Sequence, residues 1–429
     1  MQPKTEQSAG NRWAIAVAGI VMQIALGAVY AWSVFRKPLE SSFGWSTSEV
    51  TWAFSITILT LGIAAFFGGL WMARVGPRVV GVTGGVLYGL GVFLASFSAD
   101  RLLWLYFSYG LLGGVGIGLG YIVPVATLVK WFPDRRGFIT GLAVAGFGAG
   151  ALVTAPVATA LIGSVGVLRT FAYLGVAYLV LTVGAALCMR NPPAGYRPPG
   201  WNPSAAASAT ADFTLGGALR TWQWYALWAL LFLNVTAGIS IISQAAPMAQ
   251  EIAGIDAAMA AAFAGLLGIP NGLGRFLWSW LSDLVGRRWV FLAMFLAQAA
   301  VFLLLPRVAS FGLFAALTVV VLLCYGGGFG TLPAFAADYF GTRNVGPIYG
   351  LMLTAWGLGG VLGPLLIANI RESSGGYGPA LLIIGGIMLA SALVPLFVRP
   401  PRAEPQPTPT AAQEPSAETA REREVGGKQ

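Results

Sequence analysis

Long apolar stretches recur along this chain and restrict it to one class of fold. A helix needs about 20 consecutive apolar residues to cross the hydrocarbon core of a bilayer. Only 10% of the residues are charged and 57% are hydrophobic, whereas a typical soluble domain is roughly 25% charged. The sequence therefore predicts an all-α membrane protein with twelve transmembrane helices, at 13–35, 50–73, 79–98, 102–128, 138–162, 167–189, 222–245, 257–283, 288–306, 311–337, 346–369 and 378–398.

The expected helices form two sets of six, separated by a segment of different composition. Residues 190–217 are rich in Pro, Ala and Ser, which is typical of a flexible linker. We expect an N-terminal six-helix bundle in 1–189, a cytoplasmic linker in 190–217 and a C-terminal six-helix bundle in 218–398. The Pro, Ala and Glu-rich residues 399–429 are predicted to form a disordered cytoplasmic tail.

The two sets repeat each other at an offset of about 208 residues. GIGLGYIVPVATLVKWF (116–132) parallels YGGGFGTLPAFAADYF (325–340), and RRGFITGLAVAGFGAG (135–150) parallels RNVGPIYGLMLTAWGLGG (343–360). Parallel repeats of six helices place a substrate site at their interface, near the middle of the bilayer. We therefore expect a site between the two bundles.

The basic residues predict the orientation in the membrane. With both termini inside, 18 of the 25 Lys and Arg residues fall in inner loops and tails and six in outer loops, as the positive-inside rule requires. The net charge of +9 thus reflects topology, and no nucleic-acid partner is expected. We expect a multi-pass, monomeric protein of the bacterial inner membrane with cytoplasmic termini, whose first apolar run is retained as a helix.

Arg275 is the only charged residue expected near the middle of a membrane span. An arginine at that depth costs about 2.5–3.5 kcal/mol, so it normally faces a wet cavity or a partner. All sixteen carboxylates fall in loops, tails or helix ends. We interpret the missing anion as the substrate; the alternative is an arginine satisfied by backbone carbonyls or hydroxyl groups.

Asn271 lies one helical turn before Arg275 and can add an amide donor on the same face. Pro270, Gly272 and Gly274 are expected to interrupt this helix. Aromatic residues at similar depth in other spans are further candidates for substrate binding, although each could serve ordinary helix packing: Tyr30, Tyr121, Phe147, Tyr325, Phe329 and Trp356.

The charged motif SDLVGRR (282–288) lies at the inner end of the eighth span. Asp283, Arg287 and Arg288 are predicted to form a latch between the bundles that opens on gating; the alternative is a simple positive-inside anchor. The chain has no histidine and only two cysteines. No metal or cofactor is expected, and without an intramembrane acid pair or nucleophile motif an enzyme is not expected either.

These features resemble the major facilitator superfamily. SDLVGRR looks like the superfamily's loop motif between helices eight and nine, whereas its counterpart ARVGPR (73–78) has Ala73 where an acid is usual. Within the superfamily, GAVYAWSVF (27–35) and YGLMLTAWGLGGVLGP (349–364) resemble the oxalate:formate antiporter family, which is related to the monocarboxylate transporters. The resemblance implies two six-helix bundles and alternating access.

The resemblance also implies roles for individual residues. Arg275 matches the substrate-binding arginine of helix eight. Monocarboxylate transporters typically carry an aspartate four residues earlier, where this chain has Asn271. The oxalate exchanger has a second cation in helix eleven, where Trp356 stands here, which suits a monocarboxylate better than a dicarboxylate. We therefore expect secondary active transport of lactate- or pyruvate-like acids, coupled to protons. The alternative is carboxylate exchange of the oxalate:formate type, because an empty site would leave Arg275 uncompensated.

Overall fold

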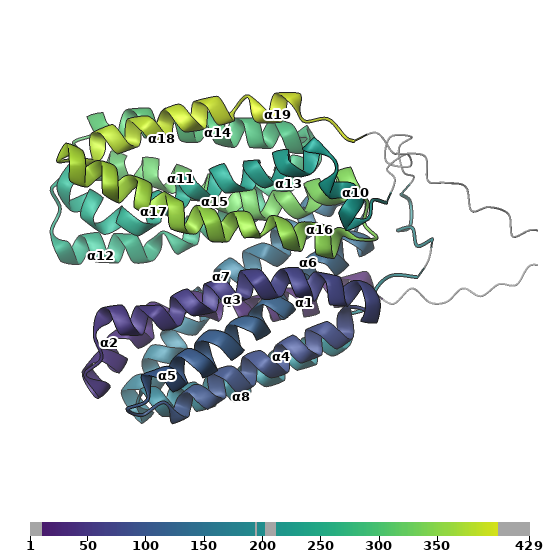
Figure 1. Cartoon of the computed structure of the whole chain (residues 1–429), viewed down its shortest axis with the longest axis horizontal. Helices are drawn as coiled ribbons and strands as arrows, with labels where there is room; N and C mark the ends of the chain where they lie inside the picture. Colours follow the sequence, from purple (N-terminus) through teal and green to yellow (C-terminus); the bar gives the residue numbers. More distant parts are fainter. Residues whose placement is uncertain (1–10, 194, 202–211, 402–429) are drawn as a thin grey trace, which may run out of the picture.

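The protein is an assembly of long, nearly parallel helices. The structure, a computed structural model, describes residues 11–193, 195–201 and 212–401 (Figure 1). Within these ranges every regular element is helical, and eleven helices are long and apolar enough to cross a membrane. The all-α prediction is confirmed. Parts of the predicted linker (194 and 202–211) and most of the predicted tail (402–429) lie outside the described residues.

The first half of the chain forms one bundle of six spans, drawn in purple and blue (Figure 1). Several spans are composites of shorter helical pieces, because 3-10 and π turns interrupt the α-helical pattern. The elements are α1 Arg12–Leu26, η1 Gly27–Ala31 and α2 Trp32–Phe43; α3 Thr47–Val75; α4 Pro77–Leu94 with η2 Ala95–Phe97; α5 Leu102–Leu105, η3 Tyr106–Gly113 and α6 Gly114–Trp131; α7 Arg136–Val165; and α8 Val167–Cys188.

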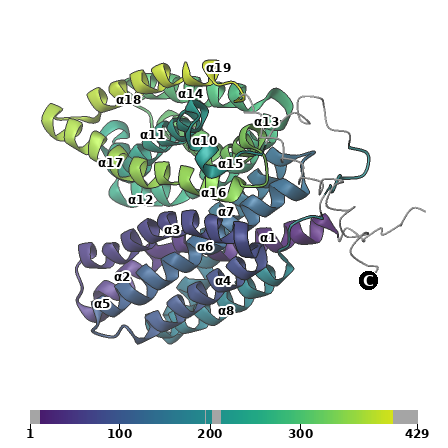
Figure 2. The same ribbon diagram turned by 45° about the vertical axis from the view of Figure 1, so that its right-hand side comes forward.

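The second half forms the other bundle, drawn in teal to yellow, and both views show the two bundles side by side (Figure 2). The described chain ends and the linker segments lie at one end of the molecule, here called the linker end; the opposite end is the far end. The elements are α10 Leu215–Leu219; α11 Trp222–Ala253; α12 Ala257–Leu266 and α13 Gly268–Val285; α14 Arg287–Leu304 with η4 Leu305–Arg307; α15 Phe311–Phe340; α16 Val345–Met352 and α17 Thr354–Ser374; and α18 Tyr377–Ser391 with α19 Val394–Phe397.

The eighth predicted span, 257–283, is not one continuous helix. It divides into α12 and α13 at Leu267. Pro270 has no N–H to donate to the carbonyl of Leu266, so the helical hydrogen-bond ladder is interrupted there. This pair of helices supplies the twelfth span beside the eleven others.

Two helices run further than the apolar pattern predicts. The first span continues to Phe43 rather than 35, and α11 continues to Ala253 rather than 245. Each ends at a glycine in the left-handed region, Gly44 with φ 68° and Gly254 with φ 65°, which is a common helix stop. Hydropathy predicts where a helix leaves the membrane, whereas capping decides where the helix ends.

Glycines let α13 and α15 pack with their backbones in contact. A Cβ atom added to Gly326 would meet the carbonyl oxygen of Asn271, and one added to Gly330 would meet that of Arg275. On the facing helix, a Cβ on Gly274 would meet the carbonyl oxygen of Leu323. Small residues permit this close approach between membrane helices. The packing fixes where the polar residues of α13 lie relative to α15.

Gly326→Ala is therefore expected to destabilise the protein, by about 1–3 kcal/mol through overpacking. The melting temperature of the purified protein in detergent checks this. Gly386→Ala is the matched control, because Gly386 also lies in a membrane helix but has no atom within 4 Å of the added Cβ. We expect no loss of stability in the control; equal melting temperatures for both variants would contradict the prediction.

Candidate functional site

The Arg275 side chain is buried, with 1% of its surface exposed. Its Nε lies 3.4 Å from Asn271 Oδ1, and its Nη1 lies 3.5 Å from the main-chain oxygen of Val144 in the other bundle. Both distances are at the long limit of hydrogen bonding. Its Nη2 has no hydrogen-bond partner among the described residues. A guanidinium offers five N–H donors, so this one retains unused capacity to bind an acceptor.

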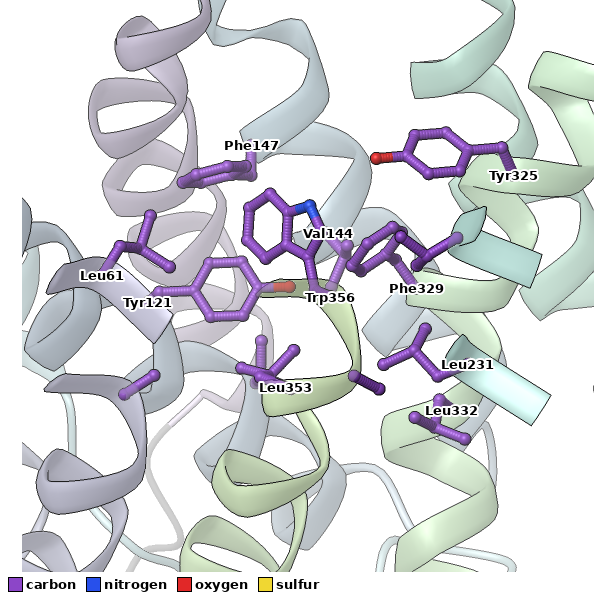
Figure 3. Close-up of a cluster of buried hydrophobic side chains, with 14 of the residues drawn as sticks. Leu61, Tyr121, Val144, Phe147, Leu231, Tyr325, Phe329, Leu332, Leu353 and Trp356 are labelled. Carbon is purple, nitrogen blue, oxygen red and sulfur yellow. The ribbon is translucent and has the colours of Figure 1, made fainter. Parts of the chain in front are cut away.

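An aromatic wall from the second half lies against Arg275. The guanidinium carbon lies 5.0 Å from the centre of the Phe329 ring, a cation–π distance. Phe329 in turn contacts Tyr325 and Trp356 edge to face, with ring centres 5.3 Å and 5.2 Å apart. Tyr325 and Phe329 belong to α15 and Trp356 to α17, and Figure 3 shows the Trp356 side chain between Phe329 and Tyr121.

A second aromatic group comes from the first half. Tyr30 of η1 and Tyr121 of α6 both contact the Phe147 ring of α7 edge to face, at 5.3 Å and 5.0 Å between ring centres. The Tyr30 hydroxyl lies beside the Arg275 guanidinium. Figure 3 shows Tyr121 and Phe147 opposite Tyr325 and Phe329. The structure thus brings together all eight residues predicted to bind substrate; the binding role itself stays a prediction.

Buried amide side chains donate hydrogen bonds to the main-chain carbonyl oxygens of two site tyrosines, Tyr121 and Tyr325. Gln23 Nε2 donates to the carbonyl oxygen of Tyr121 at 3.3 Å. In the other half, Asn234 Nδ2 donates to the carbonyl oxygen of Tyr325 at 3.0 Å, and Gln298 Nε2 donates to Asn234 Oδ1 at 2.9 Å. All three amides are fully buried. Sequence reasoning missed them, although an amide within an apolar span is itself an indication of a buried polar contact.

The predicted latch motif joins the two halves near the linker end. The Asp283 carboxylate accepts hydrogen bonds from the main-chain N–H groups of Gly137 and Phe138, at 2.8 Å and 2.7 Å. These groups lie in the first turn of α7, where unpaired N–H groups and the helix dipole favour a negative charge. Arg287 forms an ion pair with the same carboxylate at 2.7 Å.

Two residues not foreseen from the sequence complete this cluster. Arg136 Nη1 of α7 pairs with Asp338 Oδ1 of α15 at 2.7 Å, and Arg287 Nε pairs with Asp338 Oδ2 at 2.8 Å. We call Arg136, Asp283, Arg287 and Asp338 the interbundle cluster. In the sequence, nothing distinguishes Arg136 from the other basic residues of the inner loops.

Arg288 does not join the interbundle cluster. Its guanidinium carbon instead lies 4.8 Å from the ring centre of Trp289. Adjacent helical residues point about 100° apart, so Arg287 and Arg288 cannot both face the same carboxylates. The structure therefore supports the predicted contact between halves for Asp283, which accepts from α7. Arg287 forms its ion pairs with Asp283 and Asp338 of its own half and so holds these two carboxylates in place, and Arg288 lies outside the cluster.

The contacts between the halves extend from the linker end to Arg275. Besides the cluster, the Thr140 hydroxyl donates to the carbonyl oxygen of Gly330 at 3.0 Å, and Gly69 packs against the backbone of Gly346. The bundles are thus closed against each other on the linker side of Arg275.

A twelve-span architecture of two bundles with a site between them is shared with known transporters. The sequence profile of the Major Facilitator Superfamily matches residues 8–273 and 229–425. The chain belongs to the Major Facilitator Superfamily. The resemblance seen in the loop motif SDLVGRR is therefore confirmed at the level of the superfamily.

Several members of the Major Facilitator Superfamily are similar over most of the chain. The uncharacterized MFS-type transporter YhjX of Escherichia coli is 30% identical over 353 residues, covering 82% of this chain and 86% of that protein. The oxalate:formate antiporter of Oxalobacter formigenes is 28% identical over 409 residues, covering 93% and 96%. Monocarboxylate transporter 13 of Rattus norvegicus is 30% identical over 411 residues, covering 91% and 90%.

The fold is also that of solved Major Facilitator Superfamily structures. The fucose:proton symporter of E. coli superimposes with a TM-score of 0.70, at 16% identity, covering 90% of this chain and 98% of that one. These relatives and neighbours are transporters rather than enzymes. The chain is accordingly a multi-pass membrane transporter that binds a small-molecule substrate.

Proposed function

We propose that this transporter carries small monocarboxylates, such as lactate and pyruvate, by secondary active transport. The observation that carries the proposal is the buried Arg275 guanidinium, which has no carboxylate partner and one nitrogen without a hydrogen bond among the described residues. A substrate carboxylate can accept paired hydrogen bonds from the guanidinium fork. Each such charge-assisted bond contributes about 1.5–3 kcal/mol. Asn271 and the nearby tyrosine hydroxyls would orient the bound acid.

The aromatic side chains around Arg275 favour a substrate with one carboxylate. Trp356 is 5% exposed and contacts Phe329, and it stands where the oxalate exchanger's second cation is expected from the resemblance. A second carboxylate would be buried there without a cation, which is strongly unfavourable. The similarity to an oxalate:formate antiporter and to a monocarboxylate transporter supports carboxylates as the substrate class.

We further propose the orientation and oligomeric state. The basic residues favour cytoplasmic termini in a bacterial inner membrane, which makes the linker end the cytoplasmic end. The interbundle cluster then closes the cytoplasmic side, so the structure corresponds to a state closed toward the cytoplasm. One chain supplies both aromatic walls and Arg275, which supports a functional monomer.

We propose proton-coupled symport as the mode of transport, because the resemblance to monocarboxylate transporters implies it; anion exchange is the second candidate, and the charged groups of the site favour it. Asn271 cannot titrate, and the cluster carboxylates Asp283 and Asp338 are already paired with arginines. An empty site would leave the Arg275 charge uncompensated during reorientation, and this observation favours exchange. The two modes differ in whether the empty carrier can return across the membrane.

Uptake of labelled lactate into proteoliposomes tests both the substrate class and the mode of transport. We expect accumulation into substrate-free vesicles when the outside is more acidic, and its loss when a protonophore is added. A strict exchanger would instead be silent unless the vesicles contain a carboxylate. Absence of counterflow for lactate, pyruvate, formate and oxalate alike would contradict the proposed substrate class; protein-free liposomes are the control.

A further inference from the structure

Asn234 and Gln298 form a chain of buried hydrogen bonds that ends at Tyr325. Asn234 Nδ2 of α11 donates to the main-chain oxygen of Tyr325 at 3.0 Å. Gln298 Nε2 of α14 donates to Asn234 Oδ1 at 2.9 Å, and both amide side chains are fully buried. A main-chain oxygen can only accept, so it requires the NH₂ group of Asn234, and the Asn234 oxygen then faces Gln298. The chain therefore fixes the orientation of Asn234 and joins three helices at one turn of α15.

The same face of α11 also contacts the Tyr325 ring. A Cβ added to Gly238, one helical turn after Asn234, would meet that ring. A Cβ added to Gly328 of α15 would meet Asn234 Nδ2. Residues four apart share a helix face, so α11 contacts Tyr325 at its carbonyl through Asn234 and at its ring through Gly238. These two contacts set the direction in which the Tyr325 side chain leaves α15.

The Tyr325 side chain extends from this turn into the candidate site. Its ring centre lies 5.3 Å from that of Phe329, and the Phe329 ring centre lies 5.0 Å from the guanidinium carbon of Arg275. Figure 3 shows the Tyr325 hydroxyl pointing away from α15, on the side where Trp356 lies. A shift of the backbone at Tyr325 would therefore move this hydroxyl relative to Arg275.

The first half of the chain contains a related bond at its own site tyrosine. Gln23 Nε2 of α1 donates to the main-chain oxygen of Tyr121 in α6, at 3.3 Å. Helices α1 and α11 begin the first spans of the two bundles, and Tyr121 and Tyr325 belong to the glycine-rich segments that repeat between them. The recurrence indicates that an amide bond to the backbone accompanies the site tyrosine in both halves. In the second half, Gln298 additionally holds the amide in place.

We infer that Asn234, held by Gln298, is a positioning residue that sets the Tyr325 hydroxyl relative to Arg275 for substrate binding. This inference rests on the proposed function, in which Arg275 binds the carboxylate and nearby tyrosine hydroxyls orient the acid. Asn234 and Gln298 act through Tyr325 and do not touch the substrate. A binding group whose orientation is held by supporting hydrogen bonds binds better than one that is free to move.

Asn234→Leu tests the inference, because it removes the donor to Tyr325 and keeps a side chain of similar volume. The measurement is the half-saturating concentration of L-lactate in counterflow, in the wild-type protein and in Tyr325→Phe. Tyr325→Phe and Asn234→Leu should each raise this concentration by about 3–10-fold, the range of one neutral hydrogen bond. In the Tyr325→Phe protein, Asn234→Leu should cause no further rise, because the hydroxyl through which Asn234 acts is already absent.

Gln298→Leu provides a second, milder variant. It retains the Asn234 donor and removes the group that holds it, so we expect a smaller rise in the half-saturating concentration, again absent in Tyr325→Phe. The Gln298 Oε1 atom that is lost has no partner among the described residues, so the variant should fold. Ser240→Ala is the matched control: Ser240 is also buried in α11 and donates to a main-chain oxygen of another helix, that of Gly363 at 2.9 Å. We expect the control to leave the half-saturating concentration unchanged.

A purely structural role for Asn234 predicts a different result. If Asn234 only joins α11 to α15, Asn234→Leu should raise the half-saturating concentration by the same factor with and without the Tyr325 hydroxyl, or lower only the melting temperature. Either result would overturn the inference, as would a Tyr325→Phe protein that binds lactate as well as the wild type. In each of these cases the wild-type protein still transports lactate. Wild-type protein that transports none of lactate, pyruvate, formate and oxalate would overturn the proposed function, and this inference with it.

Discussion

Arg275→Ala is expected to abolish monocarboxylate transport while the protein remains folded in the membrane. Among the residues that the structure describes, this side chain supplies the only cation at the site. Losing two charge-assisted hydrogen bonds corresponds to an affinity loss of about 100-fold or more. Stability should be unchanged or increased, because the variant removes a buried guanidinium whose Nη2 has no hydrogen-bond partner among the described residues. Lactate counterflow and the melting temperature, measured on the same preparation, check both expectations.

Two further arginine variants make the Arg275 experiment specific. Arg275→Lys keeps the charge but loses the two-pronged donor, so we expect weak residual transport. Arg371→Ala is the matched control: this arginine also contacts a ring, Tyr377, and pairs with Glu251 at 2.7 Å, but near the far end of α17. We expect transport to persist in the control. Undiminished lactate uptake by Arg275→Ala would refute the proposed binding role.

Asp283→Ala is expected to open the linker end and to stop transport without removing the substrate site. The variant deletes the acceptor of two main-chain N–H groups at the start of α7 and one partner of Arg287. Leaving such groups unpaired costs about 1–3 kcal/mol, so the population of the closed state should fall by about 5–150-fold. The readout is the labelling of a cysteine at position 279, because Ser279 is fully buried between the halves.

The labelling experiment needs a background without native thiols and a matched ion-pair control. Cys188 is exposed and Cys324 is buried, so both are replaced before Ser279→Cys is introduced. Asp134→Asn is the control: it removes an ion pair with Arg12, also at 2.7 Å near the linker end but within one half. We expect faster labelling in Asp283→Ala and unchanged labelling in Asp134→Asn. Equal labelling rates would show that Asp283 does not hold the halves together.

Some residues of the candidate site could be identified from the sequence, whereas the contacts of others could not. Arg275 and Asn271 could be found from the sequence, because a charge and an amide in an apolar span are unfavourable unless they have a partner. Asp338 was predicted only to lie at a helix end; its pairing with Arg136 joins residues 202 positions apart.

The sequence by itself determined the number and type of the spans and indicated the two-bundle repeat, because a bilayer requires long apolar helices; the depth of Arg275 in the membrane is its prediction. Only the tertiary structure decided which faces meet: glycine contacts bring α13 against α15 and α3 against α16, and these contacts set the two aromatic groups around Arg275. Arg287 faces Asp283 and Asp338, whereas Arg288 turns to Trp289. Such pairings depend on helix rotation and packing across the interface, which local hydropathy does not encode.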